Sequence, residues 1–366
     1  MTTHRPFAVG VALSAALLTL VAGTAGAAAA HRPGTGPMND AFTRAADVYG
    51  VPRDLLVAVG YGQTRLEGHQ GRPSQAGGYG VMHLVENPAQ QTLALAAELT
   101  GTDRDELRHD QGDNIMGAAA VLRSYADGLG LDAAERADPG AWYQVVARYG
   151  GGDDATAAGY ADAVYALLTE GVEARTPTGE MVLVHGQPVI PERGRYADLL
   201  DPQADADDPG PDYPSARWEP AHEENFEPGR TSPITTVVVH VAQGYYDGTI
   251  SWFQNPAARV SAHYVVRSSD GEVTQMVRDA DTAWHAKSAN ASSIGIEHEG
   301  FIDEPAWFTE TMYRSSAALT RFLCDSYDIP RDREHIVGHV EVPGNDHTDP
   351  GPNWDWDHYL DLVNAD

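Results

Sequence analysis

The feature of this sequence that most constrains its fold is a change in the spacing of apolar residues on either side of a segment rich in Asp and Pro. From about Asp40 to Glu170 the apolar residues recur at helical spacing, which predicts amphipathic helices. From Thr231 onward, β-branched runs typical of strands alternate with helical segments. The segment between them, from Asp201 to Pro214, is too polar to form a core. A chain of 366 residues is also longer than one core usually holds, so we expect two domains.

The N-terminal domain is predicted to be all-α and to cover residues 36–175. Apolar spacing predicts helices over 41–49, 52–61, 89–99, 114–128 and 141–149. A strand is indicated only at the end of this region, from Met181 to Val184. Residues 176–212 are expected to form an acidic, Pro-rich linker.

The C-terminal domain, residues 213–366, is predicted to have an α/β fold with a central mixed sheet and flanking helices. Strand patterns cover 235–239, 262–266, 272–277 and 293–299, and helices are expected over 248–253 and 309–327. The second and third strands are separated by a short turn and predict a hairpin. The single cysteine, Cys324, cannot form an internal disulfide. We expect its thiol to pack in the core, with a catalytic thiol as the alternative.

The first thirty residues have the pattern of a signal peptide. His4 and Arg5 precede an apolar run from Phe7 to Val21, and small residues suited to cleavage follow near Ala25 to Ala30. We therefore expect a secreted protein without stable membrane insertion, with an uncleaved anchor as the alternative. Acidic residues outnumber basic ones by 53 to 24, for a net charge of −29. This charge argues against nucleic acid as a partner, because a phosphate backbone requires a basic surface.

Three residues of the C-terminal domain form a candidate metal site. His240 closes an apolar strand, His339 follows another apolar segment, and Asp349 lies ten residues further on. Two histidines and one carboxylate leave a fourth tetrahedral position for water, as in catalytic zinc sites. In such a site zinc lowers the pKa of water to about 7. The spacing alone also fits core histidines and a loop aspartate.

Glu297 is a candidate general base. In the predicted strand 293–299, Ser293, Gly295 and Glu297 share one face. The small residues on this face leave room for a ligand or water above the carboxyl group, which could then accept a proton. The alternative is an ordinary solvated strand face.

The stretch from about Tyr213 to the C-terminus resembles the type 2 N-acetylmuramoyl-L-alanine amidases, which share a fold with the phage-lysozyme amidases and the peptidoglycan recognition proteins. Six segments match in the family's order: 238–240, 260–264, 283–286, 293–297, 337–339 and 347–352. The resemblance implies that His240, His339 and Asp349 bind Zn²⁺ and that Glu297 is the acid/base residue.

Other positions follow from the same resemblance. Where the family often has a Lys that stabilises the oxyanion, this chain has His347; a histidine can donate to an oxyanion most fully as the cation. His263, Trp284 and His285 fall in matching segments and are predicted to bind substrate or to support the groove.

The resemblance implies a hydrolase that acts on peptidoglycan and degrades the cell wall, cutting the amide bond between N-acetylmuramic acid and L-alanine. Together with the signal peptide, it places the protein outside the cell and at the wall. The alternatives are a bifunctional enzyme that also cleaves glycan, and a non-catalytic peptidoglycan-binding protein. Non-catalytic members typically lose a zinc ligand, and all three are present here. The sequence does not indicate an oligomeric state.

The region from about Asp40 to Glu170 resembles the lytic transglycosylase and goose-type lysozyme fold. The matching segments are 55–58, 63–65, 77–84, 114–115 and 146–150. The position of the family's catalytic Glu is here Gln63, and an amide cannot act as a general acid. We therefore expect a domain that binds glycan without cleaving it; the alternative is that Glu67, one helical turn on, supplies the acid.

Overall fold

The structure is a computed structural model that describes residue 1, residues 35–200 and residues 210–365. Apart from Met1, the predicted signal peptide lies outside the described residues. From Gly34 to Asp366 the chain forms one compact unit. None of the helices in the described parts of the chain is long and apolar enough to cross a membrane.

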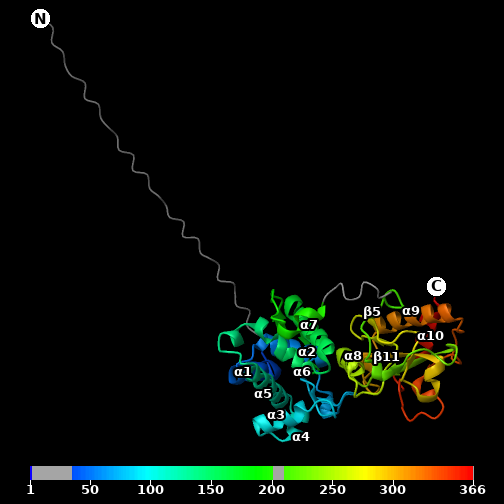
Figure 1. Ribbon diagram of the computed structural model, residues 1–366, viewed down its shortest axis with the longest axis horizontal. Coiled ribbons are helices and arrows are strands. Elements are labelled where there is room, and N and C mark those ends of the chain that lie inside the picture. The colour runs from blue at the N-terminus through cyan, green and yellow to red at the C-terminus, as the bar shows by residue number, and fades with distance from the viewer. Residues whose placement is uncertain (2–34, 201–209, 366) are drawn as a thin grey trace. The chain divides into compact units, whose positions relative to one another are not determined.

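Helices dominate the first half of the described chain, coloured blue to green in Figure 1. Within residues 35–200 the α-helices are α1 (Pro37–Tyr49), α2 (Arg53–Thr64), α3 (Thr92–Thr100), α4 (Arg104–His109), α5 (Gln111–Leu129), α6 (Tyr143–Gly150) and α7 (Asp154–Glu170). Five of them overlap the helices predicted from apolar spacing, and α4 and α7 were not predicted as separate elements.

Local sequence signals set the ends of these helices. Gly50 ends α1 with a left-handed backbone (φ 64°), a conformation that glycine adopts without steric cost. Asp153 precedes α7, and its carboxylate accepts a hydrogen bond from the Thr156 amide at 2.9 Å, which satisfies one of the unpaired donors of the first turn. The apolar faces of the helices meet in one core that contains fully buried side chains such as Phe42 and Trp142.

Two short hairpins correct the all-α prediction for this part of the chain. They pair β1 (Gly78–Tyr79) with β2 (Leu84–Val85), and β3 (Gly171–Arg175) with β4 (Met181–His185). Val182 and Val184 of β4 are buried in the helical core, so the first part of the predicted linker 176–212 is folded. The alternation of buried and less buried residues in β4 is the period of a half-buried strand. Residues 201–209 of that linker lie outside the described residues, and the likeness to lysozymes stays a prediction.

The second half of the described chain is built around a mixed six-stranded sheet in the order β12-β7-β11-β8-β9-β5. Its strands are β5 (Arg217–Trp218), β7 (Thr236–Val241), β8 (Tyr264–Val266), β9 (Val273–Gln275), β11 (Ser293–His298) and β12 (Ile336–Gly338). The pair β8–β9 is antiparallel, as the predicted hairpin requires, and the other neighbours are parallel. A separate pair joins β6 (Phe226–Glu227) to β10 (Thr282–Ala283).

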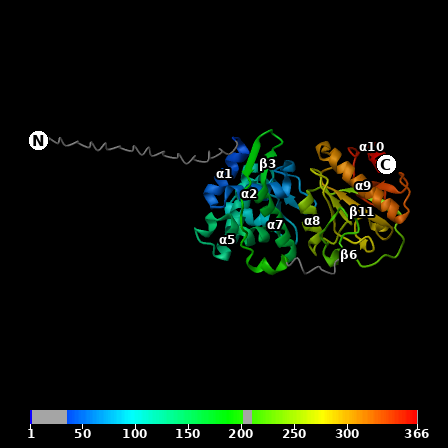
Figure 2. The same cartoon turned by 90° about the horizontal axis from the view of Figure 1, so that it is seen from above.

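Helices cover both faces of this sheet. The remaining α-helices within residues 210–365 are α8 (Tyr246–Gln254), α9 (Glu310–Tyr327) and α10 (Trp356–Asn364). Helices α9 and α10 lie side by side in both views and pack against the face that carries Ile294 and Ile296, where Cys324 is also buried (Figures 1 and 2). Helix α8 packs on the opposite face through Ile250 and Phe253. The predicted α/β fold, with a central mixed sheet and flanking helices, is therefore confirmed for this part of the chain.

Candidate active site

Three neighbouring parallel strands end at the same edge of the sheet. In the β7–β11 register His240 lies opposite Glu297, and in the β12–β7 register Gly338 lies opposite Val239. His339, the next residue after β12, therefore emerges beside His240. Because the carboxyl ends of parallel strands meet at one edge, residues more than fifty positions apart converge there.

His240, His339 and Asp349 are brought together at this edge, all buried. Their ligand atoms lie within 4.8 Å of one another. The Nδ1 atoms of His240 and His339 lie 3.3 Å and 3.2 Å from the two carboxylate oxygens of Asp349. Donor atoms held by a tetrahedral zinc at its usual bond lengths are about 3.3 Å apart. The nitrogen and oxygen donors and their spacing therefore fit a zinc ion.

Surrounding groups fix the orientation of these three side chains. The other ring nitrogen of His240, Nε2, lies 2.9 Å from Nδ1 of His285. The backbone amide of Val241 donates to Asp349 Oδ2 at 3.3 Å, and that of Val340 donates to the Asp349 carbonyl at 2.8 Å. Contacts of this kind hold the rings and carboxylate in the orientation that a metal requires.

Burial dominates the electrostatics of the site. It lowers the pKa of His240 and so favours the neutral imidazole that a metal needs. Burial opposes ionisation of Asp349 as well, but hydrogen bonds from the two histidines, and their charge, hold the pKa of that carboxyl below its usual value. The converse holds for Glu297, whose pKa is raised well above its usual value by burial and then by the charge of Asp349. Oε2 of Glu297 is buried, and within residues 35–200 and 210–365 it has no hydrogen-bond partner.

A pocket of about 400 Å³ opens over two of the three residues, His339 and Asp349. Glu297, His339, His347 and Asp349 all line it. The His347 ring stacks on that of His339 with centroids 4.5 Å apart, and its Nδ1 lies 3.8 Å from Asp349 Oδ1. Its side chain is 54% exposed, so it faces the open side of the pocket. The predicted catalytic pair, Glu297 and His347, therefore lines one pocket with two of the candidate metal ligands, and the third, His240, lies opposite Glu297 in the sheet.

The three residues predicted to bind or support substrate separate into two groups. Trp284 and His285 line the pocket. His263 is fully buried outside its lining, where its Nδ1 accepts a hydrogen bond from the Gly295 amide at 3.0 Å and its Nε2 lies 2.6 Å from Arg230. The predicted substrate contact for His263 is thus corrected to a supporting position, because both ring nitrogens are engaged inside the protein.

Gly295 explains how the His285 ring fits over β11. A Cβ atom at this position would lie 2.5 Å from Cγ and Nδ1 of that ring, much closer than atoms in contact can approach. The sequence pattern Ser293, Gly295, Glu297 on one face therefore does leave room above the strand, and a histidine ring occupies part of it.

Sequence reasoning missed two cations that line the same pocket, Arg259 and Lys287. Each directly flanks one of the six segments that resemble the amidase family: Arg259 precedes residues 260–264 and Lys287 follows residues 283–286. Their proximity to these segments could have indicated that the two residues lie near the site. A charged loop residue beside a motif is, however, more often a solvated surface residue.

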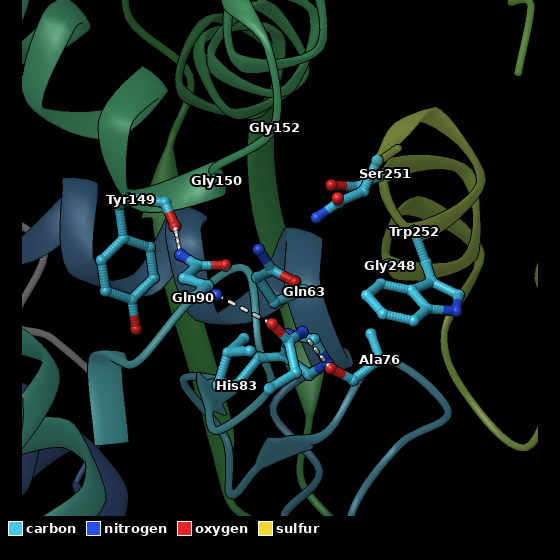
Figure 3. Close-up of a pocket in the computed structure, with 13 residues that line it drawn as sticks. Gln63, Ala76, His83, Gln90, Tyr149, Gly150, Gly152, Gly248, Ser251 and Trp252 are labelled. Atoms are coloured by element: carbon cyan, nitrogen blue, oxygen red, sulfur yellow. Dashed lines mark hydrogen bonds between the residues drawn. The ribbon is translucent and has the colours of Figure 1, made fainter. Parts of the chain in front are cut away.

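Gln63, on α2, lines a different and much smaller pocket, shown in Figure 3. Its side chain faces Trp252 and Ser251 of α8, and its Oε1 is buried with no hydrogen-bond partner among the residues that the structure describes. The pocket has a volume of about 30 Å³, room for one or two waters and not for a sugar ring. Glu67 is not among the lining residues. Its carboxyl is hydrogen-bonded to Glu304, and burial, followed by the charge of Glu304, raises its pKa to about 7.

Comparisons with known proteins match the part of the chain that contains the larger pocket. The family model described as N-acetylmuramoyl-L-alanine amidase matches residues 230–352. N-acetylmuramoyl-L-alanine amidase A of Achromobacter lyticus is 38% identical over 171 residues, which cover 42% of this chain and 96% of that protein. The 1,6-anhydro-N-acetylmuramyl-L-alanine amidase AmpD of Escherichia coli is 38% identical over 116 residues, covering 30% of this chain and 61% of the relative. A crystal structure of a selenomethionine AmpD derivative is 30% identical, with a TM-score of 0.35, and covers 41% of this chain and 95% of that one.

Proposed function

The chain belongs to the N-acetylmuramoyl-L-alanine amidase family, and we propose from this that it hydrolyses the amide bond between N-acetylmuramic acid and L-alanine in peptidoglycan, with zinc as its cofactor. The observation that carries the proposal is the pocket at the sheet edge. In this pocket Glu297, whose Oε2 has no hydrogen-bond partner among the described residues, lies beside His339 and Asp349, which form a buried set with His240.

His240, His339 and Asp349 are the residues that would hold the zinc. Their donor atoms have the chemistry and spacing that zinc uses, and Nε2 of His339 is a further buried polar atom that has no partner in the described part of the chain. A bound zinc ion supplies Lewis-acid polarisation of the scissile carbonyl and lowers the pKa of water in the pocket.

Glu297 is the proton carrier in this proposal. It accepts the proton of the attacking water and delivers it to the leaving nitrogen of L-alanine, so that the C–N bond breaks as a C–O bond forms. Oε2 of this carboxyl has no hydrogen-bond partner among the described residues, so it is available for hydrogen bonds with water and substrate in the pocket. The low dielectric around it strengthens each of these hydrogen bonds.

His347 is placed to assist at the open side of the pocket. A donor there can form a hydrogen bond with the substrate oxygen as that oxygen gains negative charge. Stacking on His339 and the Asp349 carboxylate at 3.8 Å orient the His347 ring. Trp284 and His285 would contact the substrate where they line the pocket.

The remaining parts of the proposal concern location and the helical part of the chain. The signal-peptide pattern of residues 1–30 supports export, so that intact cell wall is the natural substrate. The amide of Gln63 in its small pocket supports a helical part that does not cleave glycan, since an amide cannot donate the required proton.

The proposal is tested by digesting purified peptidoglycan with the chain from residue 31 onward and analysing the products by mass spectrometry and end-group chemistry. We expect new free amino groups on L-alanine and no new reducing or anhydro sugar ends. New sugar ends without free L-alanine would contradict the proposal and assign the cleavage to the helical part. Binding without any cleavage would support the non-catalytic alternative.

A further inference from the structure

The chain contains one lysine, and this lysine lies in the active-site pocket. Of the 24 lysine and arginine residues, 23 are arginine and one, Lys287, is lysine. Lys287 lines the pocket together with Glu297, His339 and Asp349. The chain as a whole is strongly acidic, with a net charge of −29. A basic side chain in this pocket is therefore unusual for the chain and is a specific feature of the pocket.

The backbone at Lys287 has an unusual conformation that it shares with other residues of the pocket. Within residues 210–365, four residues other than glycine have a positive φ: Gln243 (47°), Arg259 (52°), Lys287 (47°) and Asp328 (55°). The first three line the pocket. This conformation is unfavourable for residues with a Cβ, and it persists where the surrounding structure enforces it, often at functional sites.

Hydrogen bonds fix the loop that begins at Lys287. Oδ1 of Asn290 accepts hydrogen bonds from the amides of His285 and Ala286, at 3.1 Å and 2.6 Å. The Ser288 hydroxyl donates to the carbonyl of Pro343 at 3.0 Å. Lys287 is thus held between two anchored neighbours, beside the histidine that contacts His240.

The ammonium group of Lys287 is available to a ligand. Its Nζ lies 2.5 Å from Oδ1 of Asp346, but the two side chains are 53% and 77% exposed. Such an exposed ion pair is weak, and a ligand carboxylate can take the place of Asp346. The exposed Lys287 side chain can therefore exchange Asp346 for a carboxylate of a ligand in the pocket.

From these observations we infer that Lys287 binds a carboxylate of the stem peptide and makes the enzyme selective for acidic peptides. The inference rests on the proposed function, because the ligand is the peptide of the same substrate. An ammonium group recognises a carboxylate through charge-assisted hydrogen bonds. Because hydrogen bonds hold the loop, the ammonium group has a fixed position relative to the bond that is cut. Lys287 is in this inference a specificity-determining residue, and it takes no part in proton transfer.

Two muramyl-peptides that differ only in one group, a free or an amidated side-chain carboxylate, test the inference. For Lys287→Gln we expect KM for the acidic peptide to rise about tenfold, the contribution of one charge-assisted hydrogen bond, while KM for the amidated peptide stays within about twofold. Lys287→Arg should recover most of the loss for the acidic peptide. Arg314→Gln removes an equally exposed 2.5 Å ion pair on α9 and should leave both KM values unchanged.

Because Lys287 is the only lysine, acylation of a lysine side chain, distinguished from that of the N-terminal amine by peptide mapping, reports on this residue alone. The Glu297→Gln variant would bind the peptide without cleaving it. In this variant the acidic peptide should slow the acetylation of Lys287, as measured by peptide mapping, and the amidated peptide should not. Equal KM changes for both peptides, no change for either, or acetylation unaffected by the acidic peptide would overturn the inference. Failure of the wild-type protein to cleave either peptide would instead contradict the proposed function, and the acetylation measurement separates these two cases.

Discussion

His240 and Glu297 lie directly opposite each other on the neighbouring parallel strands β7 and β11. Residues opposite each other in a sheet point to the same face, so a candidate metal ligand and a candidate proton acceptor leave the sheet side by side. No loop is needed to bring them together. This register gives the site a rigid base, to which His339 and Asp349 are added from the end of β12 and the loop after it.

Substituting Glu297 by Gln tests the role of its carboxyl group. We expect kcat for release of L-alanine-terminated peptides to fall by a factor of about 10² to 10⁴, the usual contribution of a general base. The amide has nearly the same shape, and Oε2 makes no hydrogen bond that would be lost. Zinc content and melting temperature should therefore equal those of the wild type, and a variant that keeps its activity would exclude Glu297 as the base.

Substituting Gly295 by Ala tests the packing of the site. The new Cβ would meet the His285 ring at 2.5 Å, so the ring must move, and with it the contact that orients His240. We expect a loss of about 1–3 kcal/mol in the free energy of unfolding and a larger proportional loss of activity. Urea denaturation and a peptide-release assay measure the two effects.

The matched control is Gly159→Ala on α7, where a Cβ would have no heavy atom within 4 Å. This exposed helical position should become more stable by about 0.5–1 kcal/mol, with unchanged activity. If Gly295→Ala behaved like this control, the close contact with His285 would be wrong.

Asp279 should make stability depend on pH between about 4 and 6. Burial raises the pKa of this carboxyl to about 6, although hydrogen bonds from the hydroxyls of Tyr264 and Tyr327, at 2.9 Å each, oppose the rise. The folded protein thus holds the proton to higher pH than the unfolded chain. The stabilisation from Asp279 is complete below its unfolded pKa and is lost as the pH rises through about 6.

Denaturation of the wild type and of Asp279→Asn at a series of pH values measures this effect. The difference between the two unfolding free energies should change by about 2–3 kcal/mol across the window, in favour of the variant as the pH rises. Tyr327→Phe removes one hydrogen bond that lowers the pKa and should move the window upward. A difference that does not change with pH would contradict the raised pKa.

The gathering of His240, His339 and Asp349 could be anticipated in part, because the two histidines follow strand patterns and the ends of parallel strands meet at one edge. The same reasoning placed Glu297 on the correct face, since the period of a strand is two. His263 shows the limit of this approach. Its place in a matching segment indicates that His263 lies near the site. The direction in which its ring faces depends on its burial and on its contacts with Arg230 and Gly295, which the sequence does not show.

Residues in loops were the second part of the site that could not be predicted from the sequence. Lys287 and Arg259 enter the pocket from backbone conformations that few side chains adopt, and neither apolar spacing nor propensity encodes such a conformation. Of the hairpin β3–β4, the sequence indicated β4 and missed β3, whose five residues follow a helix directly and bury only Val172 and Ala174.

The measurement that tests the central claim most directly is the release of stem peptides from purified peptidoglycan before chelation, after chelation and after zinc is added back. We expect chelation to abolish the release of peptides with N-terminal L-alanine, and about one equivalent of zinc to restore it. The Asp349→Ala variant should neither retain zinc nor recover activity. Peptide release that persists in metal-free protein, or in this variant, would contradict an amidase that depends on His240, His339 and Asp349.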